Sequence, residues 1–182
     1  YAEIIGTKDD KANKTIVLRA DIDALPIEET NNCEYKSLNE GVMHACGHDA
    51  HTASLLVSAK ILSENKNLFS GKIKLCFQQA EEIGYGARLF IDGGYLEGAS
   101  RSFGIHVGSN IPVGSIVIME GANNASVDWF RISIEGKASH VSTPELGCDA
   151  AYIISQIVVA VQSLVTRTTS PMENVLIGIG KI

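Results

Sequence analysis

The sequence predicts an α/β domain followed by the beginning of a smaller α+β domain. Short apolar, β-branched runs alternate with longer apolar segments up to about residue 120, which is typical of a layered α/β fold. A Gly-Ala-Asn-Asn-Ala segment at 121–125 interrupts this pattern, and alternating apolar and polar residues follow it. We therefore expect a first domain at 1–123 and a second, incomplete domain at 124–182.

The first predicted strand covers residues 15–20, a Thr-Ile-Val-Leu-Arg-Ala run. Pro26 argues against extending this strand, so a loop is expected from there to about Gly47. Residues 49–64 carry Ala, Leu, Val and Ile on more than one face, which predicts a largely buried helix. These segments begin a strand–helix alternation.

The alternation continues with a second predicted strand at 72–78. A short helix is expected at 84–93, where glycines close both ends. Two further apolar runs, at 102–107 and 115–119, predict two more strands.

The second domain begins with a half-exposed strand, because Phe130, Ile132 and Ile134 alternate with polar residues. A long helix with a continuous apolar stripe is predicted at 149–167, and another strand at 175–182. The sequence starts with Tyr and ends inside this last strand, so we expect it to be part of a longer chain.

Composition excludes several classes of function. The net charge of −6 and the scattered basic residues argue against binding to nucleic acid or to an anionic membrane. No apolar run reaches the roughly 18 residues of a membrane span. Four widely separated cysteines without a CxxC pair argue against a disulfide scaffold and favour a reducing, cytoplasmic compartment.

Metal-binding residue types occur in three separate segments, at 43–49, 78–82 and 104–106. They supply a thiolate, imidazoles and carboxylates, which are the ligands that zinc and related metals bind. Each segment lies next to a predicted strand end or helix start, and Asp21 and Asp23 follow the first strand. Because ligands bind outside the carboxyl ends of strands in α/β sheets, these groups can share one crevice. The pattern favours a metal-activated hydrolase.

Cys46 and His48 stand two residues apart immediately before a predicted helix. On extended backbone they would point the same way and could reach one metal. The helix start is expected to lower the pKa of the Cys46 thiol. Adjacent Glu81 and Glu82 would point in opposite directions on extended backbone, so one could bind metal while the other handles protons.

Simpler interpretations exist for each segment taken alone. His106 could be a structural histidine and the glutamate pair a solvated surface. Cys46 could instead be the nucleophile of a cysteine hydrolase, with His106 as its base. The coincidence of all three segments at strand ends favours the metal site. His44 and His51 are interpreted as structural residues or as supports for the ligands.

Taken together, four segments resemble the amidohydrolases of metallopeptidase family twenty, subfamily D. These are the segments at 19–26, 44–49, 79–82 and 104–106, and the resemblance extends in order over essentially the whole chain. The group includes N-acyl-amino-acid amidohydrolases, hippurate hydrolases and plant auxin-conjugate hydrolases. The resemblance implies a catalytic domain whose central sheet is flanked by helices on both faces, plus a smaller α+β lid domain that mediates dimers. It also implies a further metal-binding histidine in a C-terminal part that this chain does not contain.

The resemblance also implies roles for individual residues. Glu81 would be the general base, Asp23 would orient a metal ligand, and His140 would bind the substrate or steady the oxyanion, or reach into the partner subunit's site. The implied ligands of a two-metal centre are Cys46, His48, Glu82 and His106. Thiolate ligation favours zinc, while manganese, cobalt and nickel remain open.

The expected function is metal-dependent hydrolysis of the amide bond of N-acyl amino acids, in the manner of an aminoacylase or hippurate hydrolase. Two alternatives are enzymatic: a metallo-dipeptidase and a deacetylase of N-acetylated diamino acids. A third is a non-catalytic module that binds metal or ligand. The presence of Glu81 beside the ligands favours an enzyme, because binding alone needs no base.

Overall fold

The computed structural model describes residues 1–10 and 13–182 and divides into two compact units, Tyr1–Ile118 and Met119–Ile182. The units divide after residue 118, whereas the sequence suggested a boundary after 123. The assignment of the two parts to catalysis and to a dimerising lid stays a prediction.

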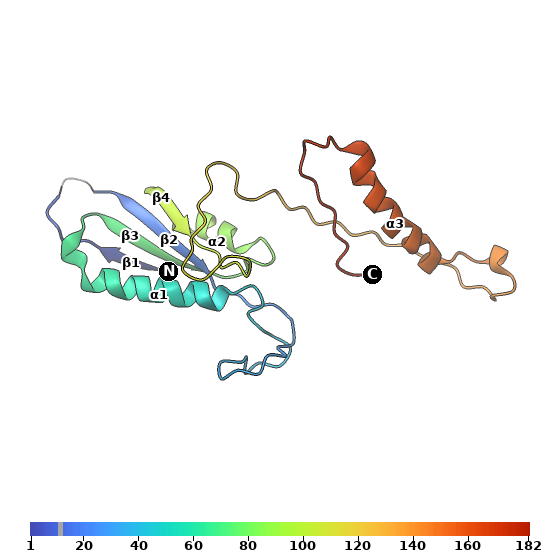
Figure 1. Ribbon diagram of the computed structural model, residues 1–182, viewed down its shortest axis with the longest axis horizontal. Helices are drawn as coiled ribbons and strands as arrows, with labels where there is room; N and C mark the ends of the chain where they lie inside the picture. Colours follow the sequence, from blue (N-terminus) through green and yellow to red (C-terminus); the bar gives the residue numbers. More distant parts are fainter. Residues whose placement is uncertain (11–12) are drawn as a thin grey trace. The chain divides into compact units, whose positions relative to one another are not determined.

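A mixed four-stranded sheet forms the centre of the first unit, with strand order β1-β3-β2-β4 (Figure 1). Its strands are β1 (Ala2–Ile5), β2 (Thr15–Asp21), β3 (Lys72–Gln78) and β4 (Ala99–Gly104). β1 runs antiparallel to β3, and β2 runs parallel to both β3 and β4. The carboxyl ends of β2, β3 and β4 therefore meet at one edge of the sheet.

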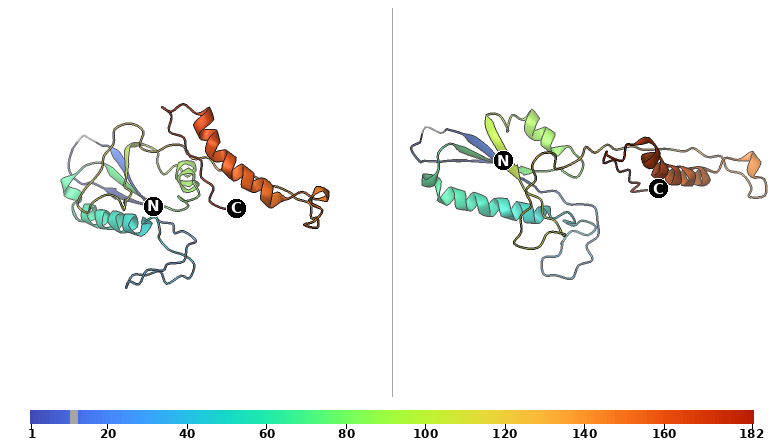
Figure 2. Two further views of the ribbon diagram at one scale, coloured as in Figure 1. Left: turned by 45° about the vertical axis from the view of Figure 1, so that its right-hand side comes forward. Right: turned by 45° about the horizontal axis from the view of Figure 1, so that its top comes forward.

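The two α-helices described in this unit cover opposite faces of the sheet (Figure 2). Leu55 of α1 (His48–Glu64) packs against Ala20, Ile73 and Leu75. Phe90 of α2 (Gly86–Asp92) lines a small groove with side chains from the other face of the strands. Successive side chains of a strand alternate between the faces, so the sheet is flanked on both sides, as expected.

The predicted strands at 15–20 and 72–78 and the predicted helices at 49–64 and 84–93 are confirmed to within one or two residues at either end. β4 begins and ends about three residues before its predicted range, and β1 was not predicted because four residues give too short a pattern.

The strand predicted at 115–119 does not form within the part of the chain that the structure describes. Ile116 and Ile118 lie largely exposed between Gly114 and Gly121, which adopt positive φ angles of 87° and 89°. An apolar run needs a hydrogen-bonding neighbour to become a strand, and this one has none among the described residues.

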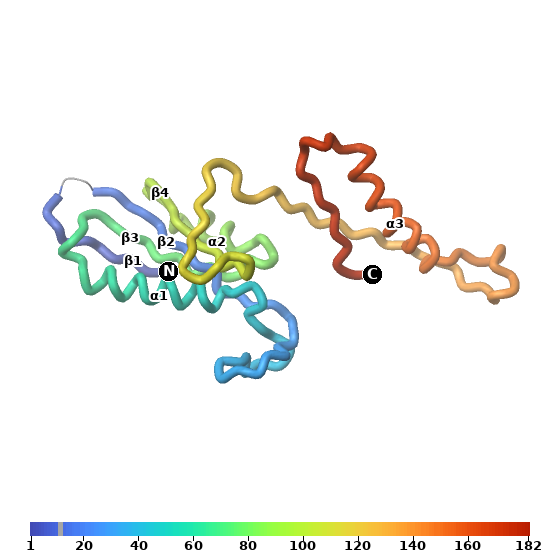
Figure 3. The backbone as a smooth tube through the Cα atoms, viewed as in Figure 1, coloured from blue at the N-terminus to red at the C-terminus, as the bar shows by residue number. Residues whose placement is uncertain are grey.

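Helix α3 (Ala150–Thr168) dominates the second unit, and extended segments precede and follow it (Figure 3). The side chain of Asp149 caps the helix by accepting a hydrogen bond of 3.0 Å from the backbone N–H of Tyr152. The helix predicted at 149–167 is therefore confirmed. The strands predicted at 130–134 and 175–182 are not: residues 119–182, all of them described, form no strand. The two segments do not hydrogen-bond to each other or to a third strand among the described residues, so neither becomes a strand.

On length and composition alone, α3 could cross a membrane, with a mean hydropathy of 1.4 and none of its residues buried. The sequence predicted no segment of this kind, because serine and glutamine residues interrupt the apolar residues of the helix. One such helix is weak evidence for a membrane protein, and here its apolar side lines a groove of about 960 Å³ within the second unit. Other groove-lining residues come from the segments at 128–134 and 178–182. The absence of a membrane partner stays a prediction.

Candidate metal centre

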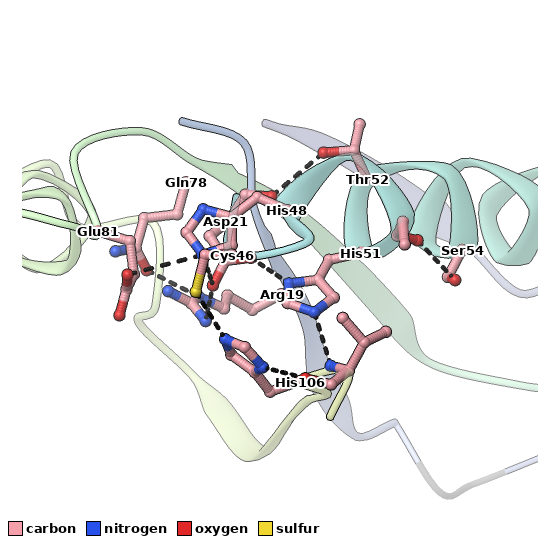
Figure 4. Close-up of polar contacts among 12 residues, drawn as sticks. Arg19, Asp21, Cys46, His48, His51, Thr52, Ser54, Gln78, Glu81 and His106 are labelled. Atoms are coloured by element: carbon pink, nitrogen blue, oxygen red, sulfur yellow. Dashed lines mark hydrogen bonds and ion pairs between the residues drawn. The ribbon is translucent and has the colours of Figure 1, made fainter. Parts of the chain in front are cut away.

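The predicted ligands converge at the edge of the sheet where β2, β3 and β4 end (Figure 4). Asp21 is the last residue of β2, Glu81 follows the end of β3, and His106 follows the end of β4. Cys46 and His48 come from the start of α1. The structure thus brings together residues that are up to 85 positions apart, as expected for the carboxyl edge of an α/β sheet.

Three groups of potential metal-binding side chains share His48, and two of them contain a further predicted ligand. The first of these two is Cys46, His48 and His106, and the second is His48, Glu81 and Glu82; within each group the ligand atoms lie within 4.8 Å of one another. His48 Nε2 lies 3.7 Å from Glu82 Oε1 and 3.8 Å from Glu81 Oε2. Cys46 Sγ lies 3.3 Å from His106 Nε2.

Gly47 gives the Cys46–His48 pair its geometry, which is not that of extended backbone. Its φ of 85° is left-handed, and α1 begins immediately after it. A Cβ atom at Gly47 would come within 2.4 Å of the Val107 side chain. Only glycine therefore suits this turn, on both conformational and steric grounds. The two side chains do meet, but through a helix start and not through strand alternation.

The glutamate pair also differs from the extended geometry that was expected. Ala80 has a φ of 55°, unusual for a residue with a side chain, and its carbonyl accepts hydrogen bonds from the backbone of Tyr85 and Gly86. The resulting turn sends Glu81 and Glu82 toward the same imidazole instead of in opposite directions. The expectation of opposed side chains is wrong because it assumed a strand.

His48 is fully buried, and its ring has one nitrogen engaged and one free. Nδ1 lies 2.9 Å from the backbone carbonyl of Asp23, which can only accept, so Nδ1 carries the proton and donates. Nε2 has no hydrogen-bond partner among the described residues and faces the carboxylates. Such an arrangement fixes the tautomer that a metal ligand needs.

Asp23 contacts two of the predicted ligands at once. Besides holding His48, it accepts a hydrogen bond of 3.0 Å from the backbone N–H of Glu82 through Oδ2. This position suits the predicted role of orienting a metal ligand, which stays a prediction.

Several buried polar atoms at this edge lack hydrogen-bond partners among the described residues, among them His48 Nε2, Asp23 Oδ1 and Glu82 Oε1. Leaving buried polar groups unpaired costs on the order of 1–3 kcal/mol each. A divalent cation between the imidazole and the carboxylate of Glu82 would satisfy His48 Nε2 and Glu82 Oε1. The residues present therefore fit a metal.

The pKa of the Cys46 thiol is raised, which is the reverse of the expected direction. Burial is the main cause, and the neighbouring carboxylates of Glu82, Glu81 and Asp21 add to it. A raised pKa disfavours a reactive thiolate, so the cysteine-hydrolase interpretation loses support although His106 is close to Sγ. A bound cation would instead favour the thiolate.

His140 and His44 are not among these groups. His140 belongs to the second unit, is exposed, and its Nδ1 lies 2.7 Å from Ser142 Oγ. Its role stays a prediction. His44 is exposed, and its backbone carbonyl accepts a hydrogen bond from Gly47.

The sequence did not indicate the contacts of His51, which is fully buried and hydrogen-bonded to Asp21. Burial by itself would raise the pKa of Asp21, but the hydrogen bond from His51 and the charge of Arg19 hold it below its usual range. The spacing of three residues from His48 on one helix could have indicated it, because such residues share a helix face.

Comparisons with known proteins identify the family of the chain. A family model described as peptidase family M20/M25/M40 matches residues 17–176. N-acetyl-L-cysteine deacetylase of Bacillus subtilis (strain 168) is 44% identical over 182 residues, covering 100% of this chain and 43% of that protein. Hippurate hydrolase of Campylobacter jejuni is 43% identical over 178 residues, covering 95% of this chain and 45% of that protein.

A similar solved structure is that of the Bacillus subtilis YXEP protein, described as a dinuclear metal binding peptidase from the M20 family. It is 46% identical in sequence, with a TM-score of 0.58, over 62% of this chain and 30% of that chain. The chain thus spans less than half the length of these relatives.

Proposed function

The chain belongs to peptidase family M20/M25/M40, and on that premise we propose that the complete protein is a metal-dependent amidohydrolase acting on N-acyl amino acids. The observation that carries this proposal is the buried, unpartnered pair of His48 Nε2 and Glu82 Oε1, 3.7 Å apart, with Glu81 beside them. Two candidate ligand groups that share His48 would suit a two-metal centre.

Divalent ions bound here would polarise the amide carbonyl and make water more acidic. Cys46, His48, Glu82 and His106 would hold them, and the thiolate of Cys46 favours zinc over manganese, cobalt or nickel. Asp23 would keep His48 in the required tautomer through its backbone carbonyl.

Exposure separates the tasks of the two glutamates. Glu82 is 22% exposed and its Oε1 is buried without a partner, as suits a ligand, whereas Glu81 is 39% exposed. A general base must reach both water and substrate, so Glu81 is the better candidate. It would take the proton from water and pass it to the leaving amine.

The substrate class rests on the relatives. N-acetyl-L-cysteine deacetylase and hippurate hydrolase are both named for reactions on N-acyl amino acids. We propose the same class of substrate, N-acyl amino acids, for the complete protein. The proposal does not specify which acyl group the substrate carries. A cytoplasmic homodimer that assembles through the second unit is part of the same proposal.

The test uses the full-length protein with N-acetyl-L-cysteine, hippurate and an unblocked dipeptide, and follows the release of free amino acid. Release from the acylated substrates should stop with EDTA and return with zinc, manganese, cobalt or nickel. Cleavage of the dipeptide alone would instead support a metallo-dipeptidase. No release of any kind from folded, metal-loaded protein would contradict the proposal and favour a binding module.

A further inference from the structure

We propose that His51 is a positioning residue: it holds His106 in place for metal binding through the backbone of Val107. The inference rests on the proposed metal centre and adds to it a residue whose role is not to bind metal itself. Three observations carry it: the hydrogen bonds of His51, the contacts of Val107, and the irregular segment that carries His106.

The hydrogen bonds of His51 determine its tautomer. Its Nδ1 is hydrogen-bonded to the carboxylate of Asp21, which accepts, so Nδ1 carries the proton. Its Nε2 lies 2.9 Å from the backbone nitrogen of Val107, whose N–H donates, so Nε2 is the acceptor. His51 lies near Asp21 and His48 in a geometry that could hold a metal. Because both of its ring nitrogens are occupied, however, His51 acts as a bridge and not as a ligand.

Val107 passes this constraint to His106. While its N–H is held by His51, its carbonyl accepts a hydrogen bond of 2.7 Å from His106 Nδ1. That bond places the proton of His106 on Nδ1 and leaves Nε2 facing Cys46 Sγ at 3.3 Å. The rings of His51 and His106 also meet edge to face, with centroids 4.7 Å apart. Val107 contacts the Gly47 turn as well, so it touches the backbone between the other two ligands of this group.

His106 needs such a support more than His48 does. His48 is buried on a regular helix, whereas His106 is exposed on a segment that follows β4 and forms neither helix nor strand among the described residues. Asp21, the hydrogen-bond partner of His51 Nδ1, is itself held in place. Arg19 Nη1 lies 2.8 Å from Asp21 Oδ2, and Arg19 Nε donates to Gln78 Oε1 at 2.8 Å, which ties β2 to β3.

A purely structural histidine would tie α1 to β2 through Asp21 and do nothing for the metal. Two substitutions separate the possibilities, because each preserves one of the two hydrogen bonds. The side-chain amide of His51→Asn sits where Nδ1 was and can still donate to Asp21, but it loses Val107. The amide oxygen of His51→Gln reaches the position of Nε2 and can still accept from Val107, but it loses Asp21.

The experiment titrates Co²⁺ into the metal-free, full-length protein and its two variants. The absorption band of the Cys46 thiolate–cobalt bond is followed, and a competing chelator extends the range of affinities. His51→Asn should bind about 10–100-fold more weakly, the usual loss when the support of a ligand is removed. His51→Gln should bind close to the wild-type affinity even if it unfolds at a lower temperature.

Thermal unfolding of the metal-free proteins provides the control for folding. Wild-type affinity in folded His51→Asn would overturn the inference, as would a loss in both variants that follows their loss of stability. Where His51→Asn does not fold, a weakened affinity in folded His51→Gln overturns it and an unchanged one supports it. A wild-type protein that binds no cobalt would overturn the metal centre itself, and the role of His51 with it.

Discussion

The two units of the chain use the same sequence patterns with opposite results. In each, a long apolar helix lies between two apolar runs that predict strands. In the first unit these runs become β2 and β3, which pair in parallel and bury Leu55 of α1 against Ile73 and Leu75. In the second unit no strand forms over 119–182, and no residue of α3 is buried.

A sequence pattern favours a helix or a strand, but the element becomes buried only where another element packs against it. Every side chain that is buried among the described residues lies in the first unit, and so do the unpartnered polar atoms of the candidate metal centre. The buried polar groups of the candidate metal centre are thus held by the packed sheet of the first unit.

The largest effect is expected from Glu81→Gln in the full-length protein. Turnover should fall by about 10²–10⁴-fold, because a positioned general base contributes this much. Metal content, measured by elemental analysis, should not change. Glu64→Gln at the exposed end of α1 is the matched control and should keep full turnover. Near wild-type turnover in Glu81→Gln would show that Glu81 is not the general base.

The corresponding test of the second unit is His140→Ala. If His140 steadies the oxyanion, kcat should fall by about 10²–10³-fold, the loss typical of one donor. The affinity for metal should stay unchanged, because all the predicted ligands of this chain lie in the first unit. Unchanged kcat and KM would show that His140 takes part neither in the chemical step nor in substrate binding. The second unit would then contribute no residue that the sequence predicts for catalysis.

Core truncation tests the contrast in packing. Leu75→Ala, 3% exposed, should destabilise the protein by about 2–5 kcal/mol, because it leaves a cavity under α1. Leu164→Ala on α3, 52% exposed, should change stability by no more than about 0.5 kcal/mol. Denaturant unfolding of the full-length protein measures both. A large effect at Leu164 would show that α3 is packed in the complete protein, and the comparison would fail.

The smallest effect concerns the start of α3. Asp149→Ala removes the side chain that caps the helix and should cost about 1 kcal/mol. The exposed Glu173→Ala, outside the helix, is the control. α3 has no buried side chain that would hold it, so its stability should depend on the Asp149 cap. α1 begins without a side-chain cap and is held by its buried residues instead. Equal stability of the Asp149 variant and its control would contradict this.

Much of the first unit could be predicted from local pattern. The runs at 15–20 and 72–78 are short, apolar and bounded by polar residues, and in the structure they pair with each other as β2 and β3. The placement of Glu81 and His106 just past strand ends indicated a shared crevice, and the structure brings them together with His48. The strands at 130–134 and 175–182 could not be judged in the same way, because a strand exists only through a neighbour's hydrogen bonds.

The sequence alone predicted β2, β3, β4 and both α-helices of the first unit, though not β1, and it indicated which residue types gather where those strands end. The tertiary structure decided how they meet. It replaced extended backbone by turns at Gly47 and Ala80, and it reversed the expected pKa shift of Cys46 by placing carboxylates around a buried thiol. It also made His51 a bridge between Asp21 and Val107. Periodicity reports on neighbours along the chain, whereas hydrogen-bond partners, burial and electric fields come from residues dozens of positions away.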